Sequence, residues 1–296
     1  MRVFLTGASG FIGSAVIPEL IDAGHEVLGL ARSDAAAATV AASGAAVHRG
    51  SLEDLDSLRR GADGVDAVIH AGFIHEFDKF AENSAIDRQA ILAMGEVLAG
   101  SDRPLIVTSG TGFTTSGRPR TEDDPPIPSS ARMPRASEEA ASAVQAQGVR
   151  TMIVRLPQVH DRFKQGIITY MVAAARERGV SPYVGDGLNR LAAVPLPAAA
   201  QLYRLVLEKG EPGARYQAIA EEGVPTRAIA EALGRGLNVP VVSMSPEEAF
   251  EHFGWLGAFL GADLSASSTL TRQRLGWEPT GDGLIADLDR MDYGNP

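Results

Sequence analysis

Residues 3–34 read VFLTGASGFIGSAVIPELIDAGHEVLGLARSD and carry the strongest structural signal in the sequence. A short apolar strand leads into three glycines with the spacing G-x-x-G-x-x-G, and the third glycine opens a helix-length segment that returns to a second strand. In such a unit the first glycine permits the tight turn, the second lets a pyrophosphate approach the backbone, and the third lets the helix pack closely on the strand. The unpaired N–H groups of the helix N-terminus then face the phosphates. The stretch predicts a dinucleotide site formed by Thr6, Gly7, Ser9, Gly10, Phe11, Ile12 and Gly13; the alternative is a glycine turn that only packs.

Short apolar strands alternate with helix-length segments through the first half of the chain. We expect strands at 3–5, 26–31, 46–48, 67–70, 105–108 and 151–155, and helices at 12–22, 52–60, 84–98 and 137–147. This βαβ order predicts an α/β fold with a Rossmann-like, doubly wound parallel sheet. After residue 155 the alternation is lost. We expect a cofactor-binding domain at 1–160 with 191–206, and a smaller, mostly helical, C-terminal substrate domain at 161–190 with 207–296.

Composition limits the classes of function. The 296 residues carry a formal net charge of −10, which argues against nucleic-acid binding because phosphate contacts need a basic surface. No apolar run approaches the roughly 20 residues that span a bilayer, and the N-terminus does not resemble a signal peptide, so we expect a cytoplasmic protein without membrane contact. The absence of cysteine excludes disulfides and Cys-ligated metals, and no His/Asp/Glu spacing resembles a metal site.

The end of the second strand predicts which nicotinamide cofactor is used. NAD-preferring proteins usually place an acidic residue there, bonded to the ribose 2′-OH. This chain has Ala31 at that position, followed by Arg32 and Ser33. A guanidinium and a hydroxyl suit a 2′-phosphate, so the sequence favours NADP(H) over NAD(H). The alternative for Arg32 is an exposed loop arginine.

Five motifs occur in a familiar order: TGASGFIGS (6–14), VDAVIHAG (65–72), LIVTSG (105–110), VRLPQVHD (154–161) and SSTLTRQRLGWEP (267–279). With them the chain resembles the extended short-chain dehydrogenase/reductases, the NAD-dependent epimerase/dehydratase group, over essentially its whole length. The resemblance implies a Rossmann-like cofactor domain and a C-terminal substrate domain. It also implies further cofactor contacts, with the phosphates at Ala71 and Gly72, with adenine at Ser51 and Leu52, and beside the nicotinamide at Arg155, Leu156, Pro157 and Val159.

The chain departs from this family at the catalytic pair. Family members carry Tyr-x-x-x-Lys, whereas the register here, set by Ser137, places Pro134 and Glu138 at those positions. Asp87 stands where the family has an Asn. Proline has no proton to give, and a carboxylate raises the pKa of a nearby acid where lysine lowers it. The remaining candidates for contact with the reacting carbonyl or for proton relay are Ser109, Thr111 and His160; each also has a purely structural interpretation.

These features predict an atypical, NADPH-dependent ketoreductase. A ketone beside a phenol brings its own hydrogen-bonded proton, as in aromatic polyketides of the angucyclinone type and in flavonoids, so we expect a bulky aromatic ketone as substrate and the proton from its phenol or from water. Aromatic residues in the stretch 250–261 are candidate walls of an apolar pocket. Two alternatives stay open: a non-catalytic NADP(H) sensor, and an epimerase or dehydratase with tightly held NAD. The chain is expected to be a monomer or a homodimer.

Overall fold

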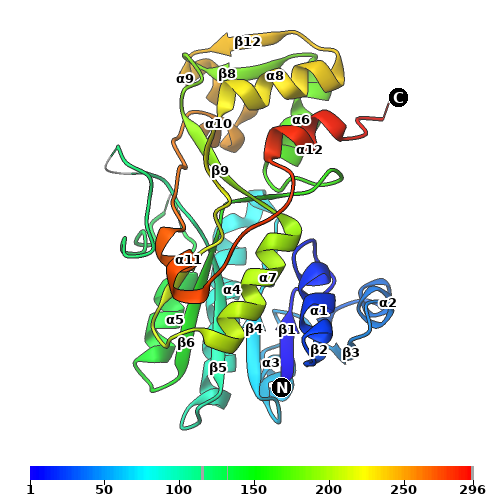
Figure 1. Cartoon of the computed structure of the whole chain (residues 1–296), viewed down its shortest axis with the longest axis vertical. Helices are drawn as coiled ribbons and strands as arrows, with labels where there is room; N and C mark the ends of the chain where they lie inside the picture. The colour runs from blue at the N-terminus through cyan, green and yellow to red at the C-terminus, as the bar shows by residue number, and fades with distance from the viewer. Residues whose placement is uncertain (115–116, 132, 295–296) are drawn as a thin grey trace. The chain divides into compact units, whose positions relative to one another are not determined.

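The computed structural model describes residues 1–114, 117–131 and 133–294, without the side chains of Phe77, His252, Trp255 and Ala258 (Figure 1). Its chain divides into two compact units, each of which is described by itself. The first unit comprises Met1–Gly110, Asp123–Arg155 and Ala200–Tyr216, and the second comprises Thr111–Glu122, Leu156–Ala199 and Gln217–Pro296. Of the range 191–206 expected in the cofactor domain, residues 200–206 lie in the first unit. The assignment of cofactor and substrate to the two units stays a prediction.

The first unit is built on a seven-stranded sheet in the order β10-β6-β5-β4-β1-β2-β3. In chain order, its strands are β1 (Arg2–Thr6), β2 (Glu26–Ala31), β3 (Ala46–Arg49), β4 (Ala67–His70), β5 (Pro104–Gly110), β6 (Arg150–Leu156) and β10 (Arg215–Gln217). The six expected strands are confirmed to within two residues at each end, and β10 is an edge strand that was not expected. Strand β1 pairs in parallel with β2 on one side and with β4 on the other, so the strand order reverses between β1 and β4. Doubly wound sheets bind their ligands at this reversal.

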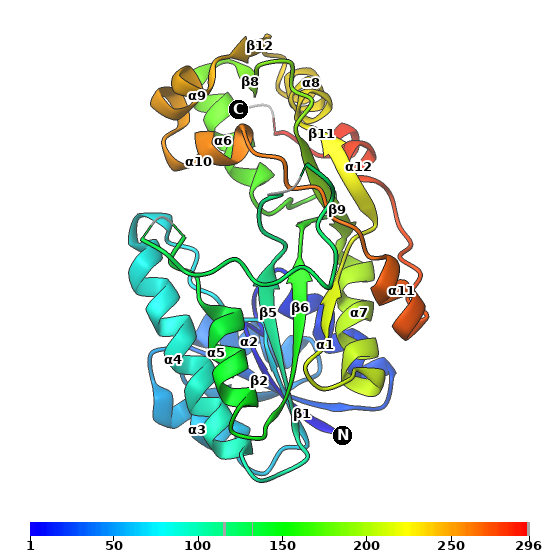
Figure 2. The ribbon, with the colours of Figure 1, turned by 90° about the vertical axis from the view of Figure 1, so that its left-hand side faces the viewer.

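Helices cover both faces of this sheet, as the βαβ order predicts. They are α1 (Gly13–Asp22), α2 (Asp34–Ala42), α3 (Leu55–Ala62), α4 (Phe80–Leu98), α5 (Ser137–Gln145) and α7 (Leu196–Lys209), with a 3-10 turn η1 (Phe77–Lys79) before α4. Figure 2 shows α3, α4 and α5 on one face, and α1 and α7 on the other. Arg204 of α7 bonds Glu19 of α1 at 2.6 Å. The central strands β1 and β4 between these layers are mostly apolar, and Val3, Phe4 and Leu5 are fully buried.

The second unit is mostly helical but contains two small sheets that were not expected. Strands β11 (Glu221–Pro225), β9 (Arg190–Pro195) and β7 (Gln158–His160) form one sheet, and β12 (Val241–Met244) with β8 (Ser181–Val184) forms the other. Its complete helices are α6 (Ile168–Arg178), α8 (Thr226–Leu237), α9 (Pro246–Phe253), α10 (Trp255–Leu260), α11 (Thr269–Leu275) and α12 (Leu284–Arg290). The apolar faces of α6, α8, α10 and α12 share one core with β9. Within the described ranges, no helix is long and apolar enough to cross a membrane.

Candidate cofactor and active site

The glycine turn between β1 and α1 is packed too tightly for side chains at two positions. Gly7 has a φ of 71°, and a Cβ there would lie 2.6 Å from the carbonyl oxygen of Ala71. A Cβ on Gly13 would lie 2.1 Å from the carbonyl oxygen of Gly7. Both obstacles are backbone atoms, which no rotamer change can move. The two glycines therefore bring the turn directly against the end of β4 and the start of α1.

The N-terminus of α1 is open to an anion. Its N-cap residue, Ile12, offers no side-chain acceptor to the first N–H groups, and no acidic residue lies in the first turn. Ser9 and Gly10, which precede this turn, are exposed. The Ser14 and Ala15 N–H groups donate to the carbonyl oxygens of Gly10 and Ile12, so it is the dipole of this uncapped helix end that favours a phosphate here. The turn therefore fits the pyrophosphate of a dinucleotide by its shape and by its charge.

The residues expected near adenine and the phosphates lie beside the glycine turn. The Gly72 N–H donates to Thr6 Oγ1 at 3.1 Å, which ties the end of β4 to the end of β1. Leu52 lies against Gly72, where a Cβ would be 3.3 Å from its Cδ1. Ser51 Oγ accepts from the Asp54 N–H at 3.3 Å, next to the start of α3. The structure thus gathers Thr6, Gly72, Ser51 and Leu52 at one edge of the sheet.

At the end of β2, Arg32 and Ser33 are both exposed, but their polar groups are differently engaged. Ser33 Oγ accepts from the Ala36 N–H at 3.2 Å and so caps α2. Arg32 has no hydrogen bond or ion pair with any residue that the structure describes. A second arginine, Arg49 of β3, lies opposite Ala31 and pairs with Asp34 at 2.5 Å. The guanidinium N–H groups of Arg32, at the end of β2, therefore donate to none of the described residues.

A buried chain of polar side chains runs from the glycine turn into the helical layer. Thr6 and His70 are register partners at the ends of β1 and β4, and Thr6 Oγ1 lies 2.8 Å from His70 Nδ1. His70 Nε2 donates to Asp87 Oδ1 of α4 at 3.0 Å, and Ser137 Oγ of α5 donates to Asp87 Oδ2 at 2.6 Å. All four side chains are buried. Asp87 and Ser137 are noted in the sequence, but no local pattern connects the four residues, because they come from four separate elements.

The Asp87 carboxylate is ionised in this chain. Burial acts to raise its pKa, but the hydrogen bond and charge of His70, the charge of Arg135 and the hydrogen bond from Ser137 together hold the pKa below its usual range. A lowered carboxylate pKa stabilises the fold above the unfolded pKa of about 3.9, and this stabilisation is lost as the pH falls through the folded value. Asp87 therefore contributes its full stabilisation at neutral pH.

Glu138, placed by the register at the lysine position, is committed to ion pairs. In the first turn of α5 it accepts from Arg155 Nε at 2.9 Å and from Arg155 Nη2 at 2.9 Å. Arg215 Nε, on β10, donates to it at 3.3 Å. Arg155 is 0% exposed and also donates to the Asp124 carbonyl oxygen. Glu138 thus balances the charge of two arginines, and the expected contact of Arg155 with the nicotinamide stays a prediction.

Around the tyrosine position, Pro134 is half-buried and the polar groups come from its neighbours. Arg135 donates through Nε to Ser137 Oγ at 3.0 Å and through Nη2 to the Thr108 carbonyl oxygen at 3.2 Å. Thr108 Oγ1 itself lies 2.6 Å from the hydroxyl of Tyr203, which is fully buried. Burial raises the pKa of Tyr203, so this phenol stays neutral inside the core. Ser109 follows on β5, half-buried, as a candidate contact to a carbonyl.

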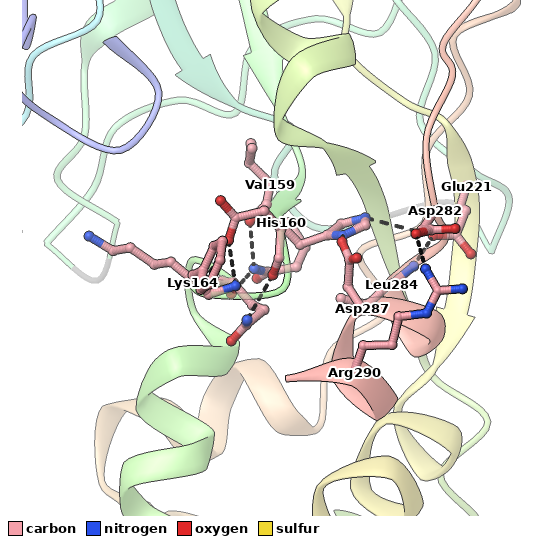
Figure 3. Close-up of polar contacts among 12 residues, drawn as sticks. Val159, His160, Lys164, Glu221, Asp282, Leu284, Asp287 and Arg290 are labelled. Carbon is pink, nitrogen blue, oxygen red and sulfur yellow. Dashed lines mark hydrogen bonds and ion pairs between the residues drawn. The ribbon is translucent and has the colours of Figure 1, made fainter. Parts of the chain in front are cut away.

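The remaining predicted site residues belong to the second unit, namely Leu156, Pro157, Val159, Thr111 and His160. His160 is 0% exposed and donates through Nδ1 to Asp287 Oδ2 of α12 at 2.6 Å. Its Nε2 lies 3.9 Å from Glu221 Oε2, which accepts from the Leu284 N–H at 2.7 Å (Figure 3). His160 therefore links β7 to α12, and its role as a proton relay stays a prediction. Thr111 Oγ1 is buried and has no hydrogen-bond partner among the described residues.

The contact between His160 and Asp287 predicts a stability effect in the second unit. Asp287→Ala leaves a buried N–H unpaired, so we expect the free energy of unfolding to fall by about 1–3 kcal/mol. Chemical denaturation measures this change. The matched control is Asp289→Ala, on the same helix, which breaks an exposed pair with Arg235 and should cost less than about 1 kcal/mol. Equal losses in the two variants would contradict the structural role of this contact.

Sequence reasoning did not single out His70, Arg135 or Arg215. His70 and Arg135 look like ordinary residues of a strand end and a loop until the fold places them beside Asp87 and Thr108. Arg215 lies in a strand of three residues that has no periodic pattern. The available signal was Asp87 itself. A carboxylate at a position where the family has an Asn needs hydrogen-bond donors around it when it is buried. No cluster of three or more metal-ligating side chains occurs in the part of the chain that the structure describes.

Comparison with known proteins places this site in a family. The model of the NAD dependent epimerase/dehydratase family matches residues 3–219. The chain is 45% identical to protein C2A9.02 of Schizosaccharomyces pombe, over 99% of this chain and 100% of that one. It is 44% identical to protein YLL056C of Saccharomyces cerevisiae, over 99% of each.

Two further similarities carry functional names. The chain is 26% identical to the 2-alkyl-3-oxoalkanoate reductase of Stenotrophomonas maltophilia, over 82% of this chain and 77% of that one. The NAD-bound structure of dTDP-glucose 4,6-dehydratase from Streptomyces venezuelae has the same fold, with a TM-score of 0.77 at 22% identity over 99% of this chain and 96% of the other. The family match spans the glycine turn, the buried polar chain and the start of α5. The chain therefore belongs to the NAD-dependent epimerase/dehydratase family and is an NAD(P)-dependent oxidoreductase.

Proposed function

We propose that this protein is an NADPH-dependent ketoreductase that acts on a bulky aromatic ketone and takes the proton from the substrate's own phenol or from an ordered water. The observation that carries the proposal is the engagement of Glu138. Its carboxylate is paired with Arg155 and Arg215, and Pro134 has no proton to donate. Neither position supplies an acid to a carbonyl. The named reductase relative supports carbonyl reduction as the reaction class.

The cofactor supplies the hydride when bound, and the residues of this chain hold and orient it. The glycine turn with the open N-terminus of α1 would bind the pyrophosphate, and Arg32 would bind the 2′-phosphate. A general acid contributes about 10²–10⁴-fold to a rate, whereas well-oriented reactants reach effective molarities of about 10⁵–10⁸ M. A site that only positions its reactants therefore keeps the larger contribution. Ser109 of β5 is the candidate hydroxyl for the carbonyl oxygen.

The second unit offers apolar surface for a flat substrate. Phe163, Tyr170 and Phe250 are exposed to 72%, 39% and 61%. Phe259 packs on Phe113 with 5.6 Å between ring centroids. Aromatic walls suit an aromatic ketone, and an ortho-phenol on that ketone holds a proton within hydrogen-bond reach of its oxygen. We assign the substrate class on these grounds, with a monomer or homodimer as the working assembly.

The cofactor preference predicts a selective loss on changing Arg32. Arg32→Ala should weaken NADPH binding by about 10- to 100-fold, because a charge-assisted hydrogen bond to the 2′-phosphate is worth about 1.5–3 kcal/mol. NADH binding should change less than about twofold, since NADH lacks that phosphate. Isothermal titration of both cofactors measures the two affinities. A parallel loss for NADPH and NADH, or no loss for either, would contradict the 2′-phosphate assignment.

The reaction itself is tested by following NADPH absorbance with a panel of aromatic ketones, half of them bearing an ortho-phenol. Oxidation restricted to the phenol-bearing ketones supports a reductase that uses its substrate's proton. Tight NADPH binding without turnover of any ketone would favour the sensor. Conversion of a substrate without net cofactor oxidation would favour the epimerase or dehydratase alternative. Ser109→Ala is the matched variant, expected to slow turnover while the affinity for NADPH is kept.

A further inference from the structure

Arg135 lies at the carboxyl edge of the first unit's sheet, held from three sides. Its Nε donates to Ser137 Oγ, at the start of α5, and its Nη2 donates to the Thr108 carbonyl oxygen near the end of β5. Its guanidinium carbon lies 4.6 Å from the ring centroid of Phe73, which follows β4. Phe73 is in turn braced by edge contacts with His75 and Phe80. The guanidinium plane is therefore fixed in place at the ends of two adjacent strands.

Part of this guanidinium is left without a partner. A guanidinium has five N–H donors. The bonds to Ser137 and Thr108 use two of them, and among the described residues Arg135 has no further hydrogen bond and no ion pair. Its side chain is partly exposed. A rigid cation with unused donors at a ligand-binding edge is prepared to bind oxygen atoms of a ligand.

The order of the strands indicates which ligand atoms reach this position. In a doubly wound sheet the adenosine ribose lies at the end of β2 and the pyrophosphate lies at the turn after β1. The second nucleotide half must then extend past the reversal of strand order, toward the ends of β4 and β5. Phe73 and Thr108 mark those two ends, and Arg135 contacts both. The second ribose, with its two hydroxyls, is the oxygen-rich group of that half.

We propose that Arg135 binds the ribose of the nicotinamide half of the cofactor. The proposal rests on the proposed dinucleotide site. Pro134 and Glu138 offer no cation to this ribose, so the proposal assigns the cationic contact to the neighbouring loop residue Arg135. The buried chain Thr6–His70–Asp87–Ser137 positions this arginine. Ser137 Oγ accepts from Arg135 while it donates to Asp87, so the arginine is linked through hydrogen bonds to the residue that starts the glycine turn. The same hydrogen-bonded residues thereby hold the proposed contacts to both halves of the dinucleotide.

The test compares the affinities of three ligands by titration calorimetry. NADPH contains both halves, 2′-phospho-ADP-ribose keeps the second ribose but lacks nicotinamide, and adenosine 2′,5′-bisphosphate lacks the second half. Arg135→Ala should weaken binding of the first two by about 10- to 100-fold and leave the third within about twofold. Arg135→Lys, which keeps the charge but loses the fork, should show an intermediate loss for the first two. If the wild type prefers the unphosphorylated series, then NADH, ADP-ribose and ADP replace the three ligands.

Controls separate this proposal from the proposed function. Arg88→Ala removes an exposed arginine of α4 and should change no affinity. Ser137→Ala removes the support of Arg135 and should weaken NADPH binding less than Arg135→Ala does. Equal weakening of all three ligands by the Arg135 variants would overturn the ribose assignment, as would no weakening of any. Failure of the wild type to bind any of the ligands would overturn the dinucleotide site itself. Arg135→Gln serves if the alanine variant does not fold.

Discussion

Gly13→Ala should abolish measurable NADPH binding, with a loss in affinity of at least about 100-fold. The added Cβ would lie 2.1 Å from the Gly7 carbonyl oxygen, 2.8 Å from the Gly7 carbonyl carbon and 2.9 Å from the Ala8 Cα. All three are backbone atoms, so the glycine turn or the start of α1 must move. Overpacking of this kind also costs about 1–3 kcal/mol of stability. Titration calorimetry measures the affinity and thermal unfolding measures the stability.

Gly261→Ala is the matched control for this variant. Its φ is −91°, and the nearest atom to an added Cβ lies 3.9 Å away, so neither strain nor overlap is expected. This control should bind NADPH as the wild type does. Near-normal NADPH affinity in Gly13→Ala would contradict the assignment of the pyrophosphate to the glycine turn.

Glu138→Ala should cost about 3–5 kcal/mol of unfolding free energy, because it leaves the buried guanidinium of Arg155 without its carboxylate. Glu138→Lys, which restores the residue type of the catalytic pair, should be worse, since it places a third cation beside Arg155 and Arg215. Restoring a lysine at this position is therefore expected to yield an unfolded protein, not a better catalyst. Chemical denaturation measures both free energies.

The adjacent Glu139 provides the comparison. Its carboxylate accepts from the Ser129 N–H and Oγ at 2.7 and 2.9 Å, and these hydrogen bonds hold its pKa below the usual range. It balances no buried arginine, so Glu139→Ala should cost about 0.5–2 kcal/mol. If Glu138→Ala cost no more than this control, the ion pair with Arg155 would not be the reason for a carboxylate at position 138.

The layered fold was predictable because parallel strands buried on both faces appear as continuous apolar runs. Strands β2 and β4 have the bounds that the sequence predicts. Short edge elements carry no such signal, so β10 and the two sheets of the second unit were not expected. Helix α7 begins at Leu196 with Pro197 in its first turn, where proline is tolerated, but this segment was not among the expected helices.

The cofactor side of the site was predictable for a different reason. The glycine spacing encodes a local backbone geometry, and the residues that require it are close in sequence. The polar residues at the reacting edge are brought together by tertiary contacts, such as Ser137 with Asp87 across 50 positions and His160 with Asp287 across 127. No local pattern in one sequence identifies such partners. Arg135 was therefore overlooked although it follows Pro134 directly.

Hydride transfer from NADPH to a ketone, at a site without a tyrosine acid, can be followed by isotope transfer. The wild-type protein would be incubated with an ortho-phenolic aromatic ketone and NADPH that carries deuterium at its transferable position. Mass spectrometry of the product should find one deuterium on the carbinol carbon of the alcohol. If NADPH bound tightly and no phenol-bearing ketone acquired deuterium, the protein would not be the reductase that we propose.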